Sequence, residues 1–214
     1  MDGAKLRRGL YFAADAGLLH GEQIMAVTRA ALEGGVVLVQ LRAKAMPAAE
    51  MTPLARALVG QCRDFGVPML VNDLPEVALE AGAAGVHLGQ EDMAVAQARR
   101  MLGGEAIIGA TTPTVEAVRR AEVEGADYVS AGPMFPSPTK PEKPVAGPEL
   151  ARRLRAETEL PLCVIGGITA QNVGELAGCG LDLVCVISAI ASAERPREAT
   201  EKLIRAMRQA GVAS

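Results

Sequence analysis

Aromatic side chains are almost missing from this chain of 214 residues, which has three Phe, two Tyr and no Trp. Proteins that bind single-stranded nucleic acid stack the bases on such rings, so this scarcity argues against that function. The net charge is −3 and no basic stripe stands out, so the electrostatic footprint of a nucleic-acid-binding surface is missing as well. We therefore expect no nucleic-acid partner.

Long hydrophobic runs are missing too. No apolar stretch approaches the roughly 20 residues of a transmembrane helix. The N-terminal segment MDGAKLRRGLYFAAD lacks the hydrophobic region and cleavage pattern of a secretory signal. We therefore expect no membrane partner and a cytoplasmic location. Half of the residues are hydrophobic, which is enough for a single domain over residues 1–214 to bury a sizeable core.

Histidine and cysteine are too few and too scattered for a cysteine-rich metal centre or a disulfide framework. The four cysteines show no CxxC spacing, and only His20 and His87 could assist them. Cys163 and Cys185 lie in apolar runs, where a free cysteine usually packs as a small hydrophobe. We therefore set both kinds of site aside.

Short apolar segments alternate with longer segments rich in Ala, Leu, Glu and Arg along the whole chain. The short segments read as strands, at 9–15, 36–44, 68–73, 85–92, 106–112, 127–132, 162–167 and 183–190. The longer ones read as amphipathic helices, at about 23–33, 48–65, 75–82, 94–102, 114–124, 148–157, 170–178 and 196–210. Eight strands, each followed by a helix, predict a (β/α)8 TIM barrel with short loops. An open doubly wound sheet is the alternative, but the glycine-rich opening of a Rossmann fold is absent.

Polar residues gather where the predicted strands end, which is the end at which such barrels carry their function. The strand at 36–44 shows the pattern best, because Gln40, Arg42 and Lys44 alternate and so point to one side. Further strands end in Asn72 and Asp73, in GQED with Asp92, and in Thr111 and Thr112. The remaining ones lead into the loop GPMFPSPTKPEKPVAG, into Gly166 and Gly167, and into Ser188.

The residue types at this rim suggest what binds there. Arg42, Lys44 and Lys140 only donate hydrogen bonds, so they favour an anion with several oxygens. Asp73 and Asp92 offer the hard oxygen ligands that suit Mg²⁺ held between protein and phosphate. Glycines after the seventh strand let backbone N–H groups approach a phosphate, a frequent feature of this fold. Two anion sites and one metal indicate a diphosphate substrate beside a monophosphate partner.

Each of these signals has an ordinary structural explanation when it is taken alone. A single Arg or Lys at a strand end is more often a solvated charge than a ligand, and Asp92 could simply cap the following helix. His87, between Val86 and Leu88, reads as a satisfied packing residue rather than a base. Their coincidence at one rim is what favours a functional site.

The motifs QLRAK, VND, GVHLGQED, GPMFPSPTK, VIGGIT and VISAI, in this order and spacing, resemble the thiamine-phosphate synthase family over nearly the whole chain. The resemblance implies a (β/α)8 barrel and a transferase of thiamine biosynthesis. Such an enzyme joins hydroxymethylpyrimidine diphosphate to hydroxyethylthiazole phosphate, with Mg²⁺, and releases diphosphate. Its partners would be these small molecules, with a homo-oligomer possible. The family reaction is dissociative, since diphosphate leaves before the thiazole nitrogen attacks.

The resemblance also implies roles for individual residues. Asp73 and Asp92 would hold Mg²⁺, and Arg42, Lys44 and Lys140 would be catalytic. The pyrimidine diphosphate would be bound by Gln40, Arg42, Lys44, Asn72 and Lys140. The thiazole phosphate and the diphosphate would be lined by Thr111, Ser137, Thr139, Gly167, Ile187 and Ser188.

Three positions depart from the family pattern. Leu74 stands where the family commonly has Arg, which removes a cation near the metal. Ser137 replaces a threonine and keeps its hydroxyl. Thr111-Thr112-Pro113 stands where Ser-x-His is common, which weakens a related alternative, a barrel that tautomerises the thiazole phosphate with a histidine there. A second alternative is a non-catalytic barrel that only binds thiamine or thiazole phosphate, and diphosphate release would separate it from a synthase.

Overall fold

A closed barrel of parallel strands forms the centre of the molecule. The computed structural model describes residues 6–137 and 144–213. Within these residues eight strands pair in sequence order, and the last pairs with the first. Their bounds are β1 Gly9–Asp15, β2 Leu38–Arg42, β3 Met69–Asn72, β4 Gly85–Leu88, β5 Ile107–Thr111, β6 Tyr128–Ala131, β7 Leu162–Ile165 and β8 Leu183–Val186. The prediction of a (β/α)8 barrel is confirmed.

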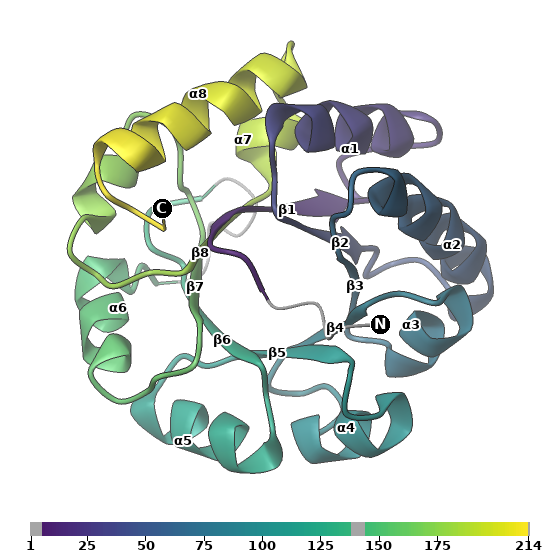
Figure 1. The fold of residues 1–214 in the computed structure, drawn as a ribbon, viewed down its shortest axis with the longest axis horizontal. Coiled ribbons are helices and arrows are strands. Elements are labelled where there is room, and N and C mark those ends of the chain that lie inside the picture. Colours follow the sequence, from purple (N-terminus) through teal and green to yellow (C-terminus); the bar gives the residue numbers. More distant parts are fainter. Residues whose placement is uncertain (1–5, 138–143, 214) are drawn as a thin grey trace.

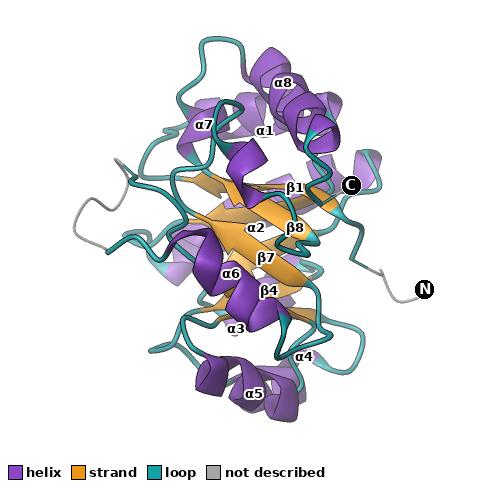
Figure 2. Cartoon of the chain, turned by 90° about the vertical axis from the view of Figure 1, so that its left-hand side faces the viewer, coloured by secondary structure: helices purple, strands orange, loops and turns teal. Residues whose placement is uncertain are grey.

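Helices surround this barrel as an outer ring (Figure 1), and the side view shows the strands enclosed between them (Figure 2). Their bounds are α1 Gln23–Gly34, α2 Ala48–Asp64, α3 Pro75–Ala81, α4 Val95–Leu102, α5 Val115–Glu124, α6 Gly147–Arg155, α7 Ser188–Ala191 and α8 Pro196–Gln209, with a 3₁₀ turn η1 at Val173–Leu176. No helix in the described part of the chain combines the length and the apolar character needed to cross a membrane.

One predicted element was wrong in kind and another was too long. The helix expected at 170–178 is only the turn η1, because Gly174 and Gly178 weaken a helix that is already short. The strand expected at 183–190 ends at Val186, and Ser188 begins the short helix α7. A short apolar run such as VISAI has the same hydrophobic pattern in a strand and in a buried helix, so the sequence could not separate the two.

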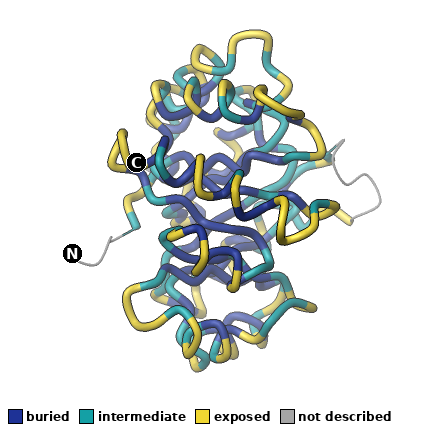
Figure 3. The backbone as a smooth tube through the Cα atoms, turned by 90° about the vertical axis from the view of Figure 1, so that its right-hand side faces the viewer, coloured by how far each residue is buried: buried dark blue, intermediate teal, exposed yellow. Residues whose placement is uncertain are grey.

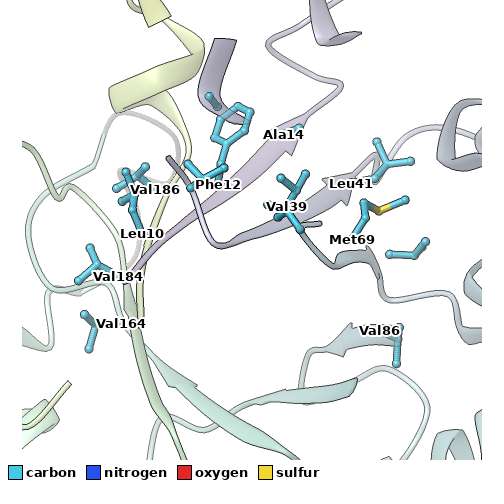
Figure 4. Packing of buried hydrophobic residues seen from close by; sticks show 14 of the residues in the cluster. Leu10, Phe12, Ala14, Val39, Leu41, Met69, Val86, Val164, Val184 and Val186 are labelled. Atoms are coloured by element: carbon cyan, nitrogen blue, oxygen red, sulfur yellow. The ribbon is translucent and has the colours of Figure 1, made fainter. Parts of the chain in front are cut away.

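The two faces of each strand belong to different parts of the core. On β1 and β2 the residues Leu10, Phe12, Val39 and Leu41 point outward and pack with residues of the helices (Figure 4). The alternating residues, such as Tyr11 and Leu38, point into the barrel and pack there with Leu70, Ile107, Tyr128, Cys163, Leu183 and Cys185. Both faces are apolar along most of each strand, which explains the unbroken hydrophobic runs in the sequence. The burial-coloured trace shows the strands as the buried centre (Figure 3).

The barrel interior changes from apolar to polar along the strand direction. On β2, Leu38 is fully buried, Gln40 is buried, and Arg42 is partly exposed at the rim. Lys44, just past the strand, is exposed. The alternation of polar residues in VQLRAK is therefore the inward face of a barrel strand that runs from the core to the open end.

One glycine makes room for a large ring inside the barrel. A Cβ atom placed on Gly109 of β5 would lie 2.0 Å from Cζ of Tyr128, which is far closer than two carbon atoms can approach. Tyr128 is fully buried and is directly opposite Gly109 in the register between β5 and β6. The absence of a side chain at Gly109 therefore allows Tyr128 to occupy the centre of the barrel.

Candidate active site

A cavity of about 200 Å³ opens at the carboxyl ends of the strands. Residues from the ends of all eight strands or from the loops that follow them line it. Most of the predicted site residues meet here, namely Gln40, Arg42, Lys44, Asn72, Asp73, Thr111, Ser137, Gly167, Ile187 and Ser188. The barrel therefore brings together side chains that are up to 148 positions apart in the sequence, from Gln40 to Ser188.

One predicted residue in the described part of the chain, Asp92, does not line this cavity. Asp92 lines a neighbouring cavity of about 220 Å³ beside α4 and α5, and its Oδ2 accepts a hydrogen bond of 2.6 Å from the N–H of Gly89. Thr139 and Lys140 lie outside the described residues. The proposed contribution of Lys140 to catalysis therefore stays a prediction.

Arg42 has a carboxylate partner that the sequence analysis did not identify. Its guanidinium forms an ion pair with Asp15, which lies directly opposite it in the register between β1 and β2. Asp15 is 4% exposed, and its other oxygen accepts a hydrogen bond of 2.8 Å from the N–H of Gly17. A buried carboxylate needs such partners, because an unpaired charge in the interior is costly. Arg42 is thus held in place at the edge of the cavity.

Lys44 and Asp73 form a second ion pair, with Nζ and Oδ2 2.9 Å apart. The Lys44 side chain is 51% exposed, whereas that of Asp73 is 19% exposed. Asp73 has a φ of 68°, in the left-handed region that few residues other than glycine adopt. This backbone conformation directs its side chain to the rim, and strain of this kind is concentrated at functional sites.

Asp73 and Asp92 lie close enough to affect one another. Burial raises the pKa of the Asp73 carboxyl, a hydrogen bond with Asp92 raises it further, and Lys44 lowers it. Two facing carboxylates repel each other when both are ionised, which is what a bound cation would relieve. No cluster of three or more His, Cys, Asp or Glu side chains with metal-binding geometry occurs in the described part of the chain. Mg²⁺ commonly binds to one or two carboxylates plus substrate phosphates, so this pair fits it.

Backbone atoms form the opposite wall of the cavity. Gly167, after β7, has a φ of 64°, and a Cβ there would lie 2.3 Å from the carbonyl oxygen of Pro136. Only glycine allows the loops after β6 and β7 to pack this closely. At Gly167 the cavity is therefore lined by main-chain atoms rather than by a side chain.

A row of hydrogen-bonded side chains forms the floor of the cavity, and the sequence analysis missed it. Gln40 Nε2 donates to the Tyr11 hydroxyl at 2.6 Å, and the hydroxyls of Tyr11 and Tyr128 are 3.2 Å apart. The Tyr128 hydroxyl lies 2.8 Å from Nδ1 of His87, and Nε2 of His87 lies 3.0 Å from the Thr111 hydroxyl. The one available signal was that both tyrosines of the chain fall in otherwise apolar strands.

His87 is satisfied by its neighbours, as the sequence analysis expected, but it also faces the cavity. Its two ring nitrogens contact Tyr128 and Thr111, and its ring stacks on that of Tyr128 with centroids 5.6 Å apart. Burial lowers the pKa of His87 to about 4, so the ring is neutral near pH 7.

Loss of Arg42 should destabilise the fold far more than loss of Lys44. Arg42→Ala leaves the buried carboxylate of Asp15 without its cation, which should cost about 3–5 kcal/mol of unfolding free energy. Lys44→Ala removes a half-exposed ion pair and should cost at most about 1 kcal/mol. Urea unfolding of both variants measures the difference. Equal losses would contradict the structural role of the Asp15–Arg42 pair.

The chain is similar to known proteins both in sequence and in structure. The family model described as thiamine monophosphate synthase matches residues 10–190. The chain is 42% identical to the thiamine-phosphate synthase of Syntrophomonas wolfei over 185 residues, 86% of this chain and 88% of that protein. It is 40% identical to that of Methylococcus capsulatus, with 92% and 88% covered. The structure of thiamine phosphate pyrophosphorylase from Pyrococcus furiosus superposes with a TM-score of 0.85 at 35% identity, covering 96% of this chain and 97% of that one.

Proposed function

The chain belongs to the thiamine monophosphate synthase family, and we propose that it joins hydroxymethylpyrimidine diphosphate to hydroxyethylthiazole phosphate. The products are thiamine phosphate and diphosphate, which makes the enzyme a transferase. The observation that carries this proposal is the grouping of two cations, the carboxylate of Asp73 and a glycine wall around one cavity, with Asp92 next to Asp73. A diphosphate and a second, smaller anion would find matching groups on opposite sides of it.

We assign the β2–β3 side of the cavity to the pyrimidine diphosphate. Arg42 and Lys44 point to the rim with Asn72 beside them, and each can donate hydrogen bonds to phosphate oxygens. Lys140, from the loop after β6, would complete this set. The Gly167 side, with Thr111, Ser137, Thr139, Ile187 and Ser188, would take the thiazole phosphate and part of the diphosphate.

Asp73 and Asp92 are the residues that would hold Mg²⁺. Bound there, the ion would neutralise negative charge on the diphosphate, as such metals do for departing phosphates. Asp73 lines the cavity and is in contact with Asp92. Leu74, where the family commonly has Arg, leaves Arg42 and Lys44 as the cations of this edge in the described part of the chain.

The reaction requires no protein nucleophile. The bond between the pyrimidine methylene carbon and the diphosphate oxygen breaks, and its electron pair leaves with the diphosphate. The lone pair of the thiazole nitrogen then forms the new carbon–nitrogen bond. The main task of Arg42 and Lys44 is to stabilise the charge that develops on the leaving group.

The other reactive groups of the cavity are in unreactive forms, which agrees with this mechanism. Burial, and then the neighbouring Cys163, raise the pKa of the Cys185 thiol well above its usual range, so it does not ionise near neutral pH. Both ring nitrogens of His87 are occupied by side chains. His87 therefore gives no support to the tautomerase alternative.

We also infer that the enzyme works in the cytoplasm. All four cysteines are free and buried, although Cys163 and Cys185 lie near one another inside the barrel. Free thiols persist in a reducing compartment, whereas secreted proteins usually pair theirs in disulfides.

The direct test is a reaction with both substrates. We expect purified protein, the pyrimidine diphosphate, the thiazole phosphate and Mg²⁺ to give thiamine phosphate and diphosphate in equal amounts. EDTA should stop the reaction, and added Mg²⁺ should restore it. Release of diphosphate without thiamine phosphate would contradict the transferase assignment, and unchanged turnover in EDTA would contradict the roles of Asp73 and Asp92.

Lys44→Ala separates catalysis from folding. Because Lys44 is half exposed, its loss should leave the fold intact but lower kcat by about 10²–10³, the effect of removing one electrostatic donor. Lys202→Ala on the outer helix α8 is the matched control, since this lysine is exposed and far from the rim in the fold. Steady-state kinetics give kcat for both variants. Equal kcat values for Lys44→Ala and Lys202→Ala would show that Lys44 has no catalytic role.

A further inference from the structure

Two cysteine side chains are in contact inside the barrel. Cys163 on β7 and Cys185 on β8 both belong to the apolar cluster of the barrel interior, and they are 0% and 3% exposed. Their thiols are hydrogen-bonded to each other. Cys185 lines the cavity, whereas Cys163 is not among the lining residues in the described part of the chain. The proposed reaction uses neither thiol, so the pair is free to have a different role.

The register between β7 and β8 places the two cysteines on a diagonal. Cys163 is opposite Leu183, and Cys185 is opposite Ile165, so the pair is one strand apart and two residues apart along the strand. With strands about 4.8 Å apart and a rise of about 3.3 Å per residue, the two Cα atoms are separated by roughly 8 Å. A disulfide does not join Cα atoms more than about 7 Å apart without backbone movement. Such movement would disturb two paired strands of the closed barrel.

A metal ion between the two sulfur atoms does not have this limit. Two metal–sulfur bonds of about 2.3 Å each span more than twice the length of one sulfur–sulfur bond of about 2.05 Å. The pair can therefore be bridged by an ion while the strands stay in register. The cavity provides the path by which an ion enters, because Cys185 lines it.

The number of ligands and the net charge select the kind of ion. No group of three or more His, Cys, Asp or Glu side chains that could hold a metal occurs in the described part of the chain, so two thiols are the set on offer. Zn²⁺ takes four ligands in structural sites and does not suit a pair. Sulfur ligands favour soft ions. A divalent ion that replaces both thiol protons leaves a neutral complex, whereas a monovalent ion would leave a negative charge in an apolar interior, which is costly.

We propose that Cys163 and Cys185 form a binding site for a soft divalent metal ion that takes two thiolates in a nearly linear arrangement, as Hg²⁺ does. Two S–H bonds break, two metal–sulfur bonds form and two protons leave for the solvent. Nothing is oxidised or reduced in this step. The site is separate from the carboxylates assigned to Mg²⁺, which are hard oxygen ligands.

The neighbours of the pair favour a long-lived complex. Tyr11 and Tyr128 belong to the same interior cluster and are fully buried, so water has little access to the sulfur atoms. An ion held there would leave only through the cavity. The proposal does not depend on the proposed function, and its tests require no turnover.

Hg²⁺ binding is best tested in a variant in which the pair supplies the only thiols. Cys62→Ala with Cys179→Ala is that variant, because both of these cysteines pack outside the barrel interior. When Hg²⁺ is supplied as its complex with glutathione, the two protons pass to glutathione. We expect one Hg²⁺ per chain, held about 10²–10⁴-fold more tightly than after the further change Cys163→Ala, because the second thiol binds within the same molecule. Zn²⁺ at the same concentration should not bind.

Equal retention of Hg²⁺ with and without Cys163 would overturn the proposal, as would two ions per chain. X-ray absorption at the mercury edge gives a second measurement that needs no change in the pair. We expect two sulfur ligands, and one, three or four sulfur ligands would each overturn the site.

Oxidation tests the geometry on which the site depends. The same Cys62→Ala and Cys179→Ala variant is treated with diamide, a thiol oxidant, and its thiols are counted after unfolding. We expect both thiols of the pair to remain, since the register keeps their Cα atoms too far apart for a disulfide. Formation of the Cys163–Cys185 disulfide in the folded protein would contradict this geometry and overturn the proposal.

Discussion

The parallel direction of the eight strands determines where the polar side chains of this protein meet. Because all strands of the barrel run in one direction, their carboxyl ends meet at one rim. Each strand turns alternate residues inward, so the polar residues near its end enter a shared space. Burying a polar group in that space raises the free energy of the folded state unless the group is hydrogen-bonded, ion-paired or bound to a ligand.

The charges at the rim follow from this constraint. Arg42 is balanced by the buried Asp15, whereas Lys44 is paired with the strained and partly buried Asp73. The first pair is held on neighbouring strands and stabilises the fold. The second lies past the strand ends, next to Asp92, where both carboxylates and a half-exposed ammonium remain available to a ligand. Arg42 therefore stabilises the fold as well as facing the cavity, whereas Lys44, two positions later and past the strand end, faces the cavity without a buried partner that depends on it.

The sequence was sufficient to predict the barrel and most of the rim. Alternating polar residues at a strand end, as in Gln40, Arg42 and Lys44, reveal both the face and the end of the strand on which they lie. The partners of these residues could not be predicted in the same way. Asp15 read as one more residue of an apolar strand, and its pairing with Arg42 depends on the register between β1 and β2.

The hydrogen bonds in the cavity floor could not be predicted from the sequence either, and the reason is related. Tyr11, His87 and Tyr128 come from three strands that are not adjacent in sequence, and their contacts exist only once the barrel closes. The empty space at Gly109 that admits Tyr128 gives no signal in the sequence apart from a glycine in a strand. Local sequence patterns were therefore enough to predict which residues lie at the rim. Which of their polar groups are hydrogen-bonded within the protein, and which remain open to a ligand, depends on the closed barrel.

If this rim binds diphosphate together with a divalent cation, the affinity for diphosphate must depend on Mg²⁺. Calorimetric titration of inorganic diphosphate into the protein, with and without Mg²⁺, measures this dependence. We expect diphosphate to bind at least about tenfold more tightly when Mg²⁺ is present, a difference of about 1.4 kcal/mol, and we expect Asp73→Asn to remove this gain. The same dissociation constant with and without Mg²⁺, or a full Mg²⁺ effect in Asp73→Asn, would contradict this expectation.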